Sequence, residues 1–218
     1  MDLFDILGPV MVGPSSSHTA GAVRMGRMAR ALLCEAPARA EILLHGSFAA
    51  TGIGHGTDRA LAAGLLGMLP DDPRIPQSLV IARQQGLDVT VGTVVLRGAH
   101  PNTALLRVTG TLGGTLEMEA ASLGGGRIRV TRLDGLDAVF SGDTRTLIVY
   151  HRDRPGQVAD VAGMLAQHRI NIASMQLYRD ARGGRAIMVL QTDHDLTESM
   201  LSALRAQETV EKVIYLPG

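Results

Sequence analysis

Hydrophobic residues recur at helical spacing in three stretches of the first half of the chain. The first stretch has a single apolar stripe that predicts a helix ending near Leu33, with Arg24, Arg27 and Arg30 in a separate row. The second ends before Pro70, and residues 79–85 predict a third, shorter helix. The apolar positions of the first two helices are Met25, Met28, Ala29, Leu32, Leu33, Leu61, Leu65, Leu66 and Met68.

Short runs of apolar and β-branched residues, separated by turn signals, predict strands. In the first half these runs cover residues 41–45, 88–97, 103–109, 116–123 and 127–133, and Gly124 to Gly126 mark a hinge between the last two. Their spacing of about 8 to 12 residues favours an antiparallel sheet, in which 103–109 is expected to pair with 88–97.

The C-terminal part reads as a complete small unit after a boundary near Ser141 to Asp143. We expect two domains, residues 1–142 and 145–218, and an α+β fold class, with an α/β first domain. The second domain has the order βαββαβ of the ferredoxin-like fold. Its expected elements are strands at 146–150, 170–177, 186–191 and 210–215 and helices beginning near 158 and at 199.

A polar motif precedes the first helix. After Gly13 and Pro14 come Ser15, Ser16, Ser17, His18 and Thr19. A serine just before an apolar helical run is an N-cap signal, and the free N–H groups of a first turn favour an anion. We therefore expect a seat for a carboxylate or phosphate; the alternative is a polar turn that only caps the helix.

A second motif surrounds His55. The three glycines between Gly52 and Gly56 predict a loop, and Thr57 or Asp58 is expected to cap the helix that follows. An isolated histidine is more often structural, but this setting repeats the first motif. If the two helix starts face each other, they form a polar cleft with an imidazole that titrates near neutrality.

A turn containing His100, Pro101 and Asn102 separates two predicted strands. Proline and asparagine suit a turn, and a plain turn is the simplest interpretation. The alternative is that His100 and Asn102 hold the polar groups of an amino acid.

Composition narrows the function classes. The 218 residues carry a formal net charge of zero and contain no tryptophan, so we expect neither a nucleic-acid nor a membrane partner. Cys34 is the single cysteine, which excludes an internal disulfide and any cluster held by several cysteines of this chain alone. The acidic start and the absence of a long apolar run predict a cytoplasmic protein.

Residues 145–218 resemble an ACT domain, because the element order and an Arg-Pro-Gly turn after the first strand agree with that family. ACT domains usually bind amino acids, often between two paired domains, and regulate an attached enzyme. The resemblance implies that Asp153, Arg154, Gly156 and Asn171 line such a regulatory site and that the domain self-associates. The alternative is a ferredoxin-like module used only for dimerisation.

The whole chain resembles the β chain of the two-subunit, iron–sulfur-dependent L-serine dehydratases. The motifs that carry the resemblance are Phe4–Met11, Gly13–Gly21, Gly46–Phe48, Gly54–Asp58, His100–Thr103 and Gly124–Ile128. The first domain also resembles the allosteric substrate-binding domain of some phosphoglycerate dehydrogenases, which performs no chemistry. One position departs from the pattern: relatives often have lysine where this chain has Ile53.

The resemblance implies that L-serine loses water and that the resulting enamine hydrolyses to pyruvate and ammonia. A [4Fe–4S] cluster held by the partner α subunit acts as the Lewis acid for the leaving hydroxyl, and no metal is expected on this chain. His55 is implied as the acid/base residue, and His100, Asn102 and Thr103 as an effector site. The implied substrate-binding residues are Ser15, Ser16, Ser17, His18, Thr19, Thr57 and Asp58. The alternative function is a non-catalytic, amino-acid-sensing regulatory subunit.

Overall fold

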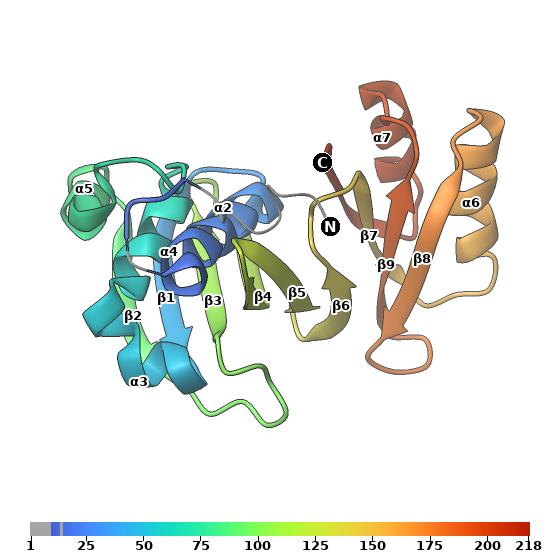
Figure 1. Cartoon of the computed structure of the whole chain (residues 1–218). Coiled ribbons are helices and arrows are strands. Elements are labelled where there is room, and N and C mark those ends of the chain that lie inside the picture. Colours follow the sequence, from blue (N-terminus) through green and yellow to red (C-terminus); the bar gives the residue numbers. More distant parts are fainter. Residues whose placement is uncertain (1–9, 14) are drawn as a thin grey trace. The chain divides into compact units, whose positions relative to one another are not determined.

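The computed structural model describes residues 10–13 and 15–218, apart from the side chain of Ile53. The motif residues before Val10, Pro14 and the Ile53 side chain therefore lie outside the described residues. The chain divides into two compact units, Met1–Asp134 and Gly135–Gly218, whose elements are labelled in Figure 1. The expected division into residues 1–142 and 145–218 stays a prediction.

The first unit contains a mixed sheet, with strands in the order β2-β1-β3-β4-β5. Strand β1 runs parallel to β2 and antiparallel to β3, so the prediction that the strand at 103–109 pairs with the one at 88–97 is wrong. The strand at 37–44 is inserted between them, and it also starts earlier than predicted. The bounds are β1 Pro37–Leu44, β2 Asp88–Thr93, β3 Thr103–Gly110, β4 Thr115–Gly124 and β5 Arg127–Leu133.

The predicted helices of the first unit are present, and three further elements join them: η1, α3 and the short η2. A π-helical turn, η1, precedes α2, and the expected glycine loop around His55 is instead helix α3. The buried Phe48 anchors α3, and packing overrides the low helix propensity of its glycines. The bounds are η1 Ser16–Gly21, α2 Ala22–Leu33, α3 Gly46–His55, α4 Thr57–Leu65, η2 Ile75–Gln77 and α5 Ser78–Gln84.

Helices α2 and α4 approach each other through glycine. A β-carbon on Gly26 would lie 2.2 Å from the Leu61 carbonyl oxygen, and one on Gly64 would lie 2.1 Å from the Val23 carbonyl oxygen. Only glycine permits this backbone contact. It fixes the crossing of two helices whose N-terminal ends adjoin the two polar motifs.

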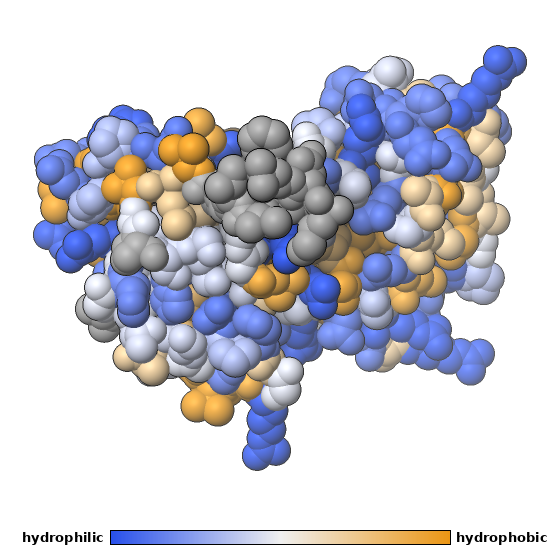
Figure 2. Space-filling model, in the orientation of Figure 1, coloured by the Kyte–Doolittle hydropathy of each residue, from blue (hydrophilic) through white to orange (hydrophobic). Residues whose placement is uncertain are grey.

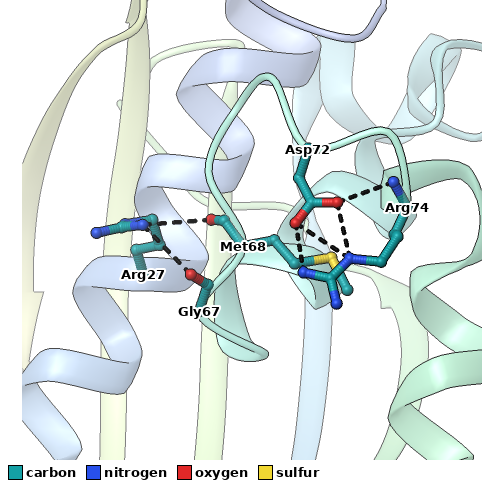
Figure 3. A network of polar contacts seen from close by, with 5 residues as sticks. All are labelled: Arg27, Gly67, Met68, Asp72 and Arg74. Carbon is teal, nitrogen blue, oxygen red and sulfur yellow. Dashed lines mark hydrogen bonds and ion pairs between the residues drawn. The ribbon is translucent and has the colours of Figure 1, made fainter.

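The arginine row of α2 holds the end of α4. Arg30 donates to the Leu65 carbonyl at 2.9 Å, and Arg27 donates to the carbonyls of Gly67 and Met68 at 3.3 and 3.5 Å. Figure 3 shows Arg27 reaching the loop after α4, where Asp72 separately grips the Arg74 side chain. Cations near the carbonyl groups at a helix C-terminus stabilise that end of the helix.

The second unit has the expected ferredoxin-like arrangement, with strand order β10-β7-β9-β8. Side chains of α6 and α7, among them Val161 and Leu204, share one buried core with Leu147 and Met188 of the sheet. Both helices therefore cover the same face. The bounds are β6 Leu136–Phe140, β7 Thr146–Arg152, α6 Gln157–Gln167, β8 Ile172–Arg179, β9 Arg185–Thr192, α7 Glu198–Arg205 and β10 Val210–Leu216.

Exposed apolar side chains are few and scattered over several elements. Val80, Val95 and Leu112 are among them, and the face drawn in Figure 2 shows apolar atoms in separate patches among hydrophilic residues. Within the described part of the chain, no helix has the length and apolar character needed to cross a membrane.

Candidate active site

The serine motif forms the first turn of the site. Ser15 is extended and caps η1, because its hydroxyl oxygen accepts from the His18 backbone N–H at 3.2 Å. The same hydroxyl lies 3.2 Å from Nδ1 of the His18 ring. Single π-helical turns occur often at functional sites, and this one turns His18 toward α3.

His18 and His55 are brought together, with ring centroids 5.0 Å apart. The His18 ring also packs against the Phe48 ring in an edge-to-face arrangement, with the ring centroids 5.1 Å apart. Its Nε2 lies 3.2 Å from the Thr51 hydroxyl oxygen, and Nδ1 of His55 lies 3.0 Å from the Thr51 carbonyl oxygen. The expected meeting of the two motifs therefore occurs, although His55 ends a helix instead of standing on a loop.

The surroundings of His18 disfavour its charged form. Burial, the larger cause, and the neighbouring His55 lower the pKa of His18 below its ordinary value of 6.5, while the Ser47 carbonyl works in the opposite direction. An imidazole that is partly withdrawn from water and lies beside a second imidazole is harder to protonate. His18 is thus favoured in its neutral form.

The glycine turn at 124–126 closes over the serine motif. Gly124, Gly125 and Gly126 have φ values of 90°, 61° and 76°, a run of left-handed residues that favours glycine. Gly125 donates its N–H to the Ser16 hydroxyl at 3.3 Å. The Ser17 side chain is half-buried and makes no hydrogen bond within the described residues.

Three of the predicted binding residues have a buried side-chain oxygen. Thr19 and Thr57 are 3% and 0% exposed. Their hydroxyl oxygens, and Oδ1 of Asp58, have no hydrogen-bond partner among the described residues. Gly56, in the left-handed region, is the N-cap of α4 and offers no side chain, so the expected capping by Thr57 or Asp58 is wrong.

The turn with His100 lies at the start of α3. His100 Nδ1 accepts from the Asn102 N–H at 3.1 Å, and the Thr103 hydroxyl donates to the His100 carbonyl at 2.7 Å. The Pro101 carbonyl accepts from the Ser47 N–H at 2.8 Å. The turn is therefore bonded directly to the first turn of the helix that carries Thr51 and His55.

In the second unit, Asp153 organises the turn after β7. Its carboxylate accepts from the Gly183 N–H at 2.9 Å and from Arg179 at 2.7 Å, and these two contacts lower its pKa. Gly156, left-handed with φ 96°, precedes α6, and Arg154 is exposed. Asn171 contacts Asp193 at 2.7 Å instead, so no described contact joins it to Asp153.

Sequence reasoning missed Thr51 and Phe48. Both lie on α3, and the four-residue steps from Ser47 to Thr51 and from Thr51 to His55 are helical spacings. They went unrecognised because the glycines of this segment favoured a loop. Among the described residues no group of three or more His, Cys, Asp or Glu side chains is placed to hold a metal ion.

Comparison with known proteins identifies the family of both units. The family model of the serine dehydratase beta chain matches residues 1–87, and the ACT domain model matches residues 145–209. A probable L-serine dehydratase beta chain from Bacillus subtilis is 41% identical over 202 residues, covering 93% of this chain and 91% of the relative. The L-serine dehydratase beta chain of Peptoniphilus asaccharolyticus is 35% identical over 214 residues, covering 98% and 96%.

A shorter similarity connects the chain to another kind of enzyme. A D-3-phosphoglycerate dehydrogenase from Synechocystis is 35% identical over 99 residues, which are 45% of this chain and 18% of that one. The near full-length matches carry more weight, because they span both units. The chain belongs to the family of L-serine dehydratase beta chains and has a C-terminal ACT domain.

Proposed function

We propose that this chain is the β subunit of a cytoplasmic L-serine ammonia-lyase, which converts L-serine to pyruvate and ammonia together with an α subunit. The observation that carries the proposal is the His18–His55 pair, at 5.0 Å, beside a serine-rich helix start. A general base next to an anion-binding site suits an amino-acid substrate, whose carboxylate must be bound and whose α-proton must be removed.

In this proposal His55 takes the α-proton as a base and then gives it to the leaving β-hydroxyl, which departs as water. Ser16, Ser17 and Thr19 donate hydrogen bonds to the carboxylate, and Ser15 and His18 support this site through their contact with each other and the contact of His18 with Thr51. Thr57 and Asp58, at the start of α4, also belong to the proposed substrate-binding site. Loss of the α-proton and of the β-hydroxyl leaves the enamine, which adds water and releases ammonia.

The residues of this chain do not fit a [4Fe–4S] cluster. Such clusters are held by cysteine thiolates, the sequence has one cysteine, and Cys34 is exposed at the end of α2. We place the cluster on the α subunit and derive no step through it on this chain.

Regulation is assigned to two places. His100, Asn102 and Thr103 form an effector site whose turn bonds to α3 through Pro101. In the ACT domain, Asp153, Arg154, Gly156 and Asn171 form an amino-acid site. Strand β8 lies at the edge of its sheet, with Met175 and Leu177 43% and 44% exposed, which favours self-association there.

The test is anaerobic co-expression with the α chain, followed by a pyruvate assay. The isolated chain should remain colourless after iron reconstitution and should not turn over serine, while the pair should be active. A stoichiometric cluster with turnover on this chain alone would contradict the proposal.

A second function is a non-catalytic amino-acid sensor, favoured by the partial similarity to a phosphoglycerate dehydrogenase. A sensor needs no base beside its carboxylate seat. The two functions therefore differ in what the loss of His55 does to turnover.

A further inference from the structure

The contacts of Thr51 determine which ring nitrogen of His18 carries a proton. The Thr51 hydroxyl donates its single hydrogen to the Ser47 carbonyl at 3.0 Å. Its oxygen is then only an acceptor toward His18 Nε2, 3.2 Å away. Nε2 of His18 must therefore bear the hydrogen.

The other nitrogen of His18 is also engaged. In a neutral imidazole with a hydrogen on Nε2, Nδ1 is an acceptor, so the Ser15 hydroxyl donates to it across 3.2 Å. The Ser15 oxygen still accepts from the His18 backbone N–H, and every donor and acceptor is matched. His18 has no lone pair free for a proton from a substrate.

His55 has the opposite arrangement. Its Nδ1 lies 3.0 Å from the Thr51 carbonyl oxygen, and a carbonyl only accepts, so Nδ1 must bear the hydrogen. The lone pair of a neutral His55 is then on Nε2. Within the described residues Nε2 of His55 makes no hydrogen bond, and the side chain is exposed.

We propose that Thr51 is the positioning residue of this site: its hydroxyl holds His18 as the Nε2–H tautomer, and its carbonyl holds His55 as the Nδ1–H tautomer. The one free lone pair of the two rings is then Nε2 of His55. This inference rests on the proposed function only for the use made of that lone pair, which is to receive the α-proton.

The test uses the full chain alone, labelled with ¹⁵N, at about pH 8, above the ordinary titration range of histidine. Long-range ¹⁵N–¹H correlation identifies the tautomer of each ring. We expect Nε2–H for His18 and Nδ1–H for His55, the less populated form of a histidine side chain in water. Nε2–H on His55, or Nδ1–H on His18, would overturn the proposal, whatever the activity of the assembled enzyme.

Thr51→Val removes the hydroxyl and keeps the carbonyl. His18 should lose its preference for the Nε2–H form, so that its Nε2–H signal disappears, while His55 stays Nδ1–H, and Thr51→Ser should restore the signal. Thr90→Val, which removes a hydroxyl on the edge strand β2, is the matched control and should leave both rings unchanged. A His18 signal that persists in Thr51→Val would refute the role of the hydroxyl.

In the enzyme assembled with its α chain, Thr51→Val should lower kcat/KM by roughly two- to ten-fold, the effect of one neutral hydrogen bond. Thr51→Ser should recover it. If the assembled enzyme proves inactive, the proposed function fails, but the spectra still test the tautomers.

Discussion

The imidazole rings of His18 and His55 lie with their centroids 5.0 Å apart and tilted by 45°. One ring follows the helix-capping Ser15 and the other ends α3. Two imidazoles so close disfavour simultaneous protonation, and burial together with this neighbour lowers the pKa of His18.

This relationship predicts the titration of His18. Because burial and His55 lower its pKa, replacing His55 by alanine should raise the pKa of His18 toward 6.5 without reaching it, since the burial remains. An NMR titration of the ring C–H signals measures the shift. An unchanged His18 pKa in the variant would show that His55 does not contribute to the shift.

The same pKa has a consequence for stability. The unfolded chain binds a proton at His18 at higher pH than the folded chain does, so the free energy of unfolding should fall as the pH drops below 6.5. His18→Gln should reduce this slope between about pH 6.5 and the lower pKa of the folded state. Urea unfolding at several pH values measures the difference, and an unchanged slope would contradict it.

Two substitutions in the serine motif distinguish substrate binding from helix capping. Ser17→Ala should lower kcat/KM by about one to two decades, if it removes charge-assisted hydrogen bonds of about 1.5–3 kcal/mol. Its stability should change little. Ser15→Ala should cost about 1 kcal/mol of stability, because Ser15 is the helix cap. Normal kinetics for Ser17→Ala would favour a purely structural turn.

The proposed effector site at His100, Asn102 and Thr103 predicts a change in how the rate depends on serine concentration. Asn102→Ala keeps the backbone bonds of the turn, including its carbonyl contact with the Ser122 N–H at 2.9 Å. We expect a nearly intact maximal rate and a flattened or shifted sigmoid in serine, because an effector acts through different affinities for two states. A variant without turnover, or a parent curve that is hyperbolic without lag, would remove the basis for this site.

A stability prediction concerns the β3–β4 hairpin. The Glu35 carboxylate accepts from the N–H groups of Leu112 and Gly114, and a β-carbon on Gly110 or Gly114 would lie 2.1 Å from it. Glu35→Ala should therefore lower the free energy of unfolding by about 1–3 kcal/mol. Urea unfolding measures the change, and Glu208→Ala, at an exposed glutamate, is the control. Equal losses of unfolding free energy in the two variants would contradict a stabilising role for the Glu35 contacts.

Much of the fold follows from local pattern. The strands and helices of the second unit lie close to their predicted positions, because alternation and helical stripes are regular there; only β6, at 136–140, had not been predicted. In the first unit, the parallel pairing of β1 with β2 had no local signal. It depends on a crossover through α3, α4 and α5, and the helix at 46–55 was hidden by its glycines.

The sequence predicts several residues of the site but not the contacts among them. The sequence indicates Ser15, His18 and His55, yet the role of Thr51 depends on the helical step from Ser47, which becomes visible only in α3. Likewise, nothing in the sequence joins Ser16 to the glycine turn at 124–126. Such long-range contacts arise from tertiary packing.

The proposed role of His55 is to remove the α-proton of serine. Steady-state pyruvate formation by the chain assembled with its α subunit tests this role. His168 is the matched control, since it ends α6 with the same contact to the carbonyl four residues earlier, at 2.9 Å. With cluster content verified for each variant, His55→Ala should lower kcat by roughly two to four decades, and His168→Ala should leave it unchanged. A His55→Ala enzyme that keeps most of its kcat would contradict the account and favour a sensor.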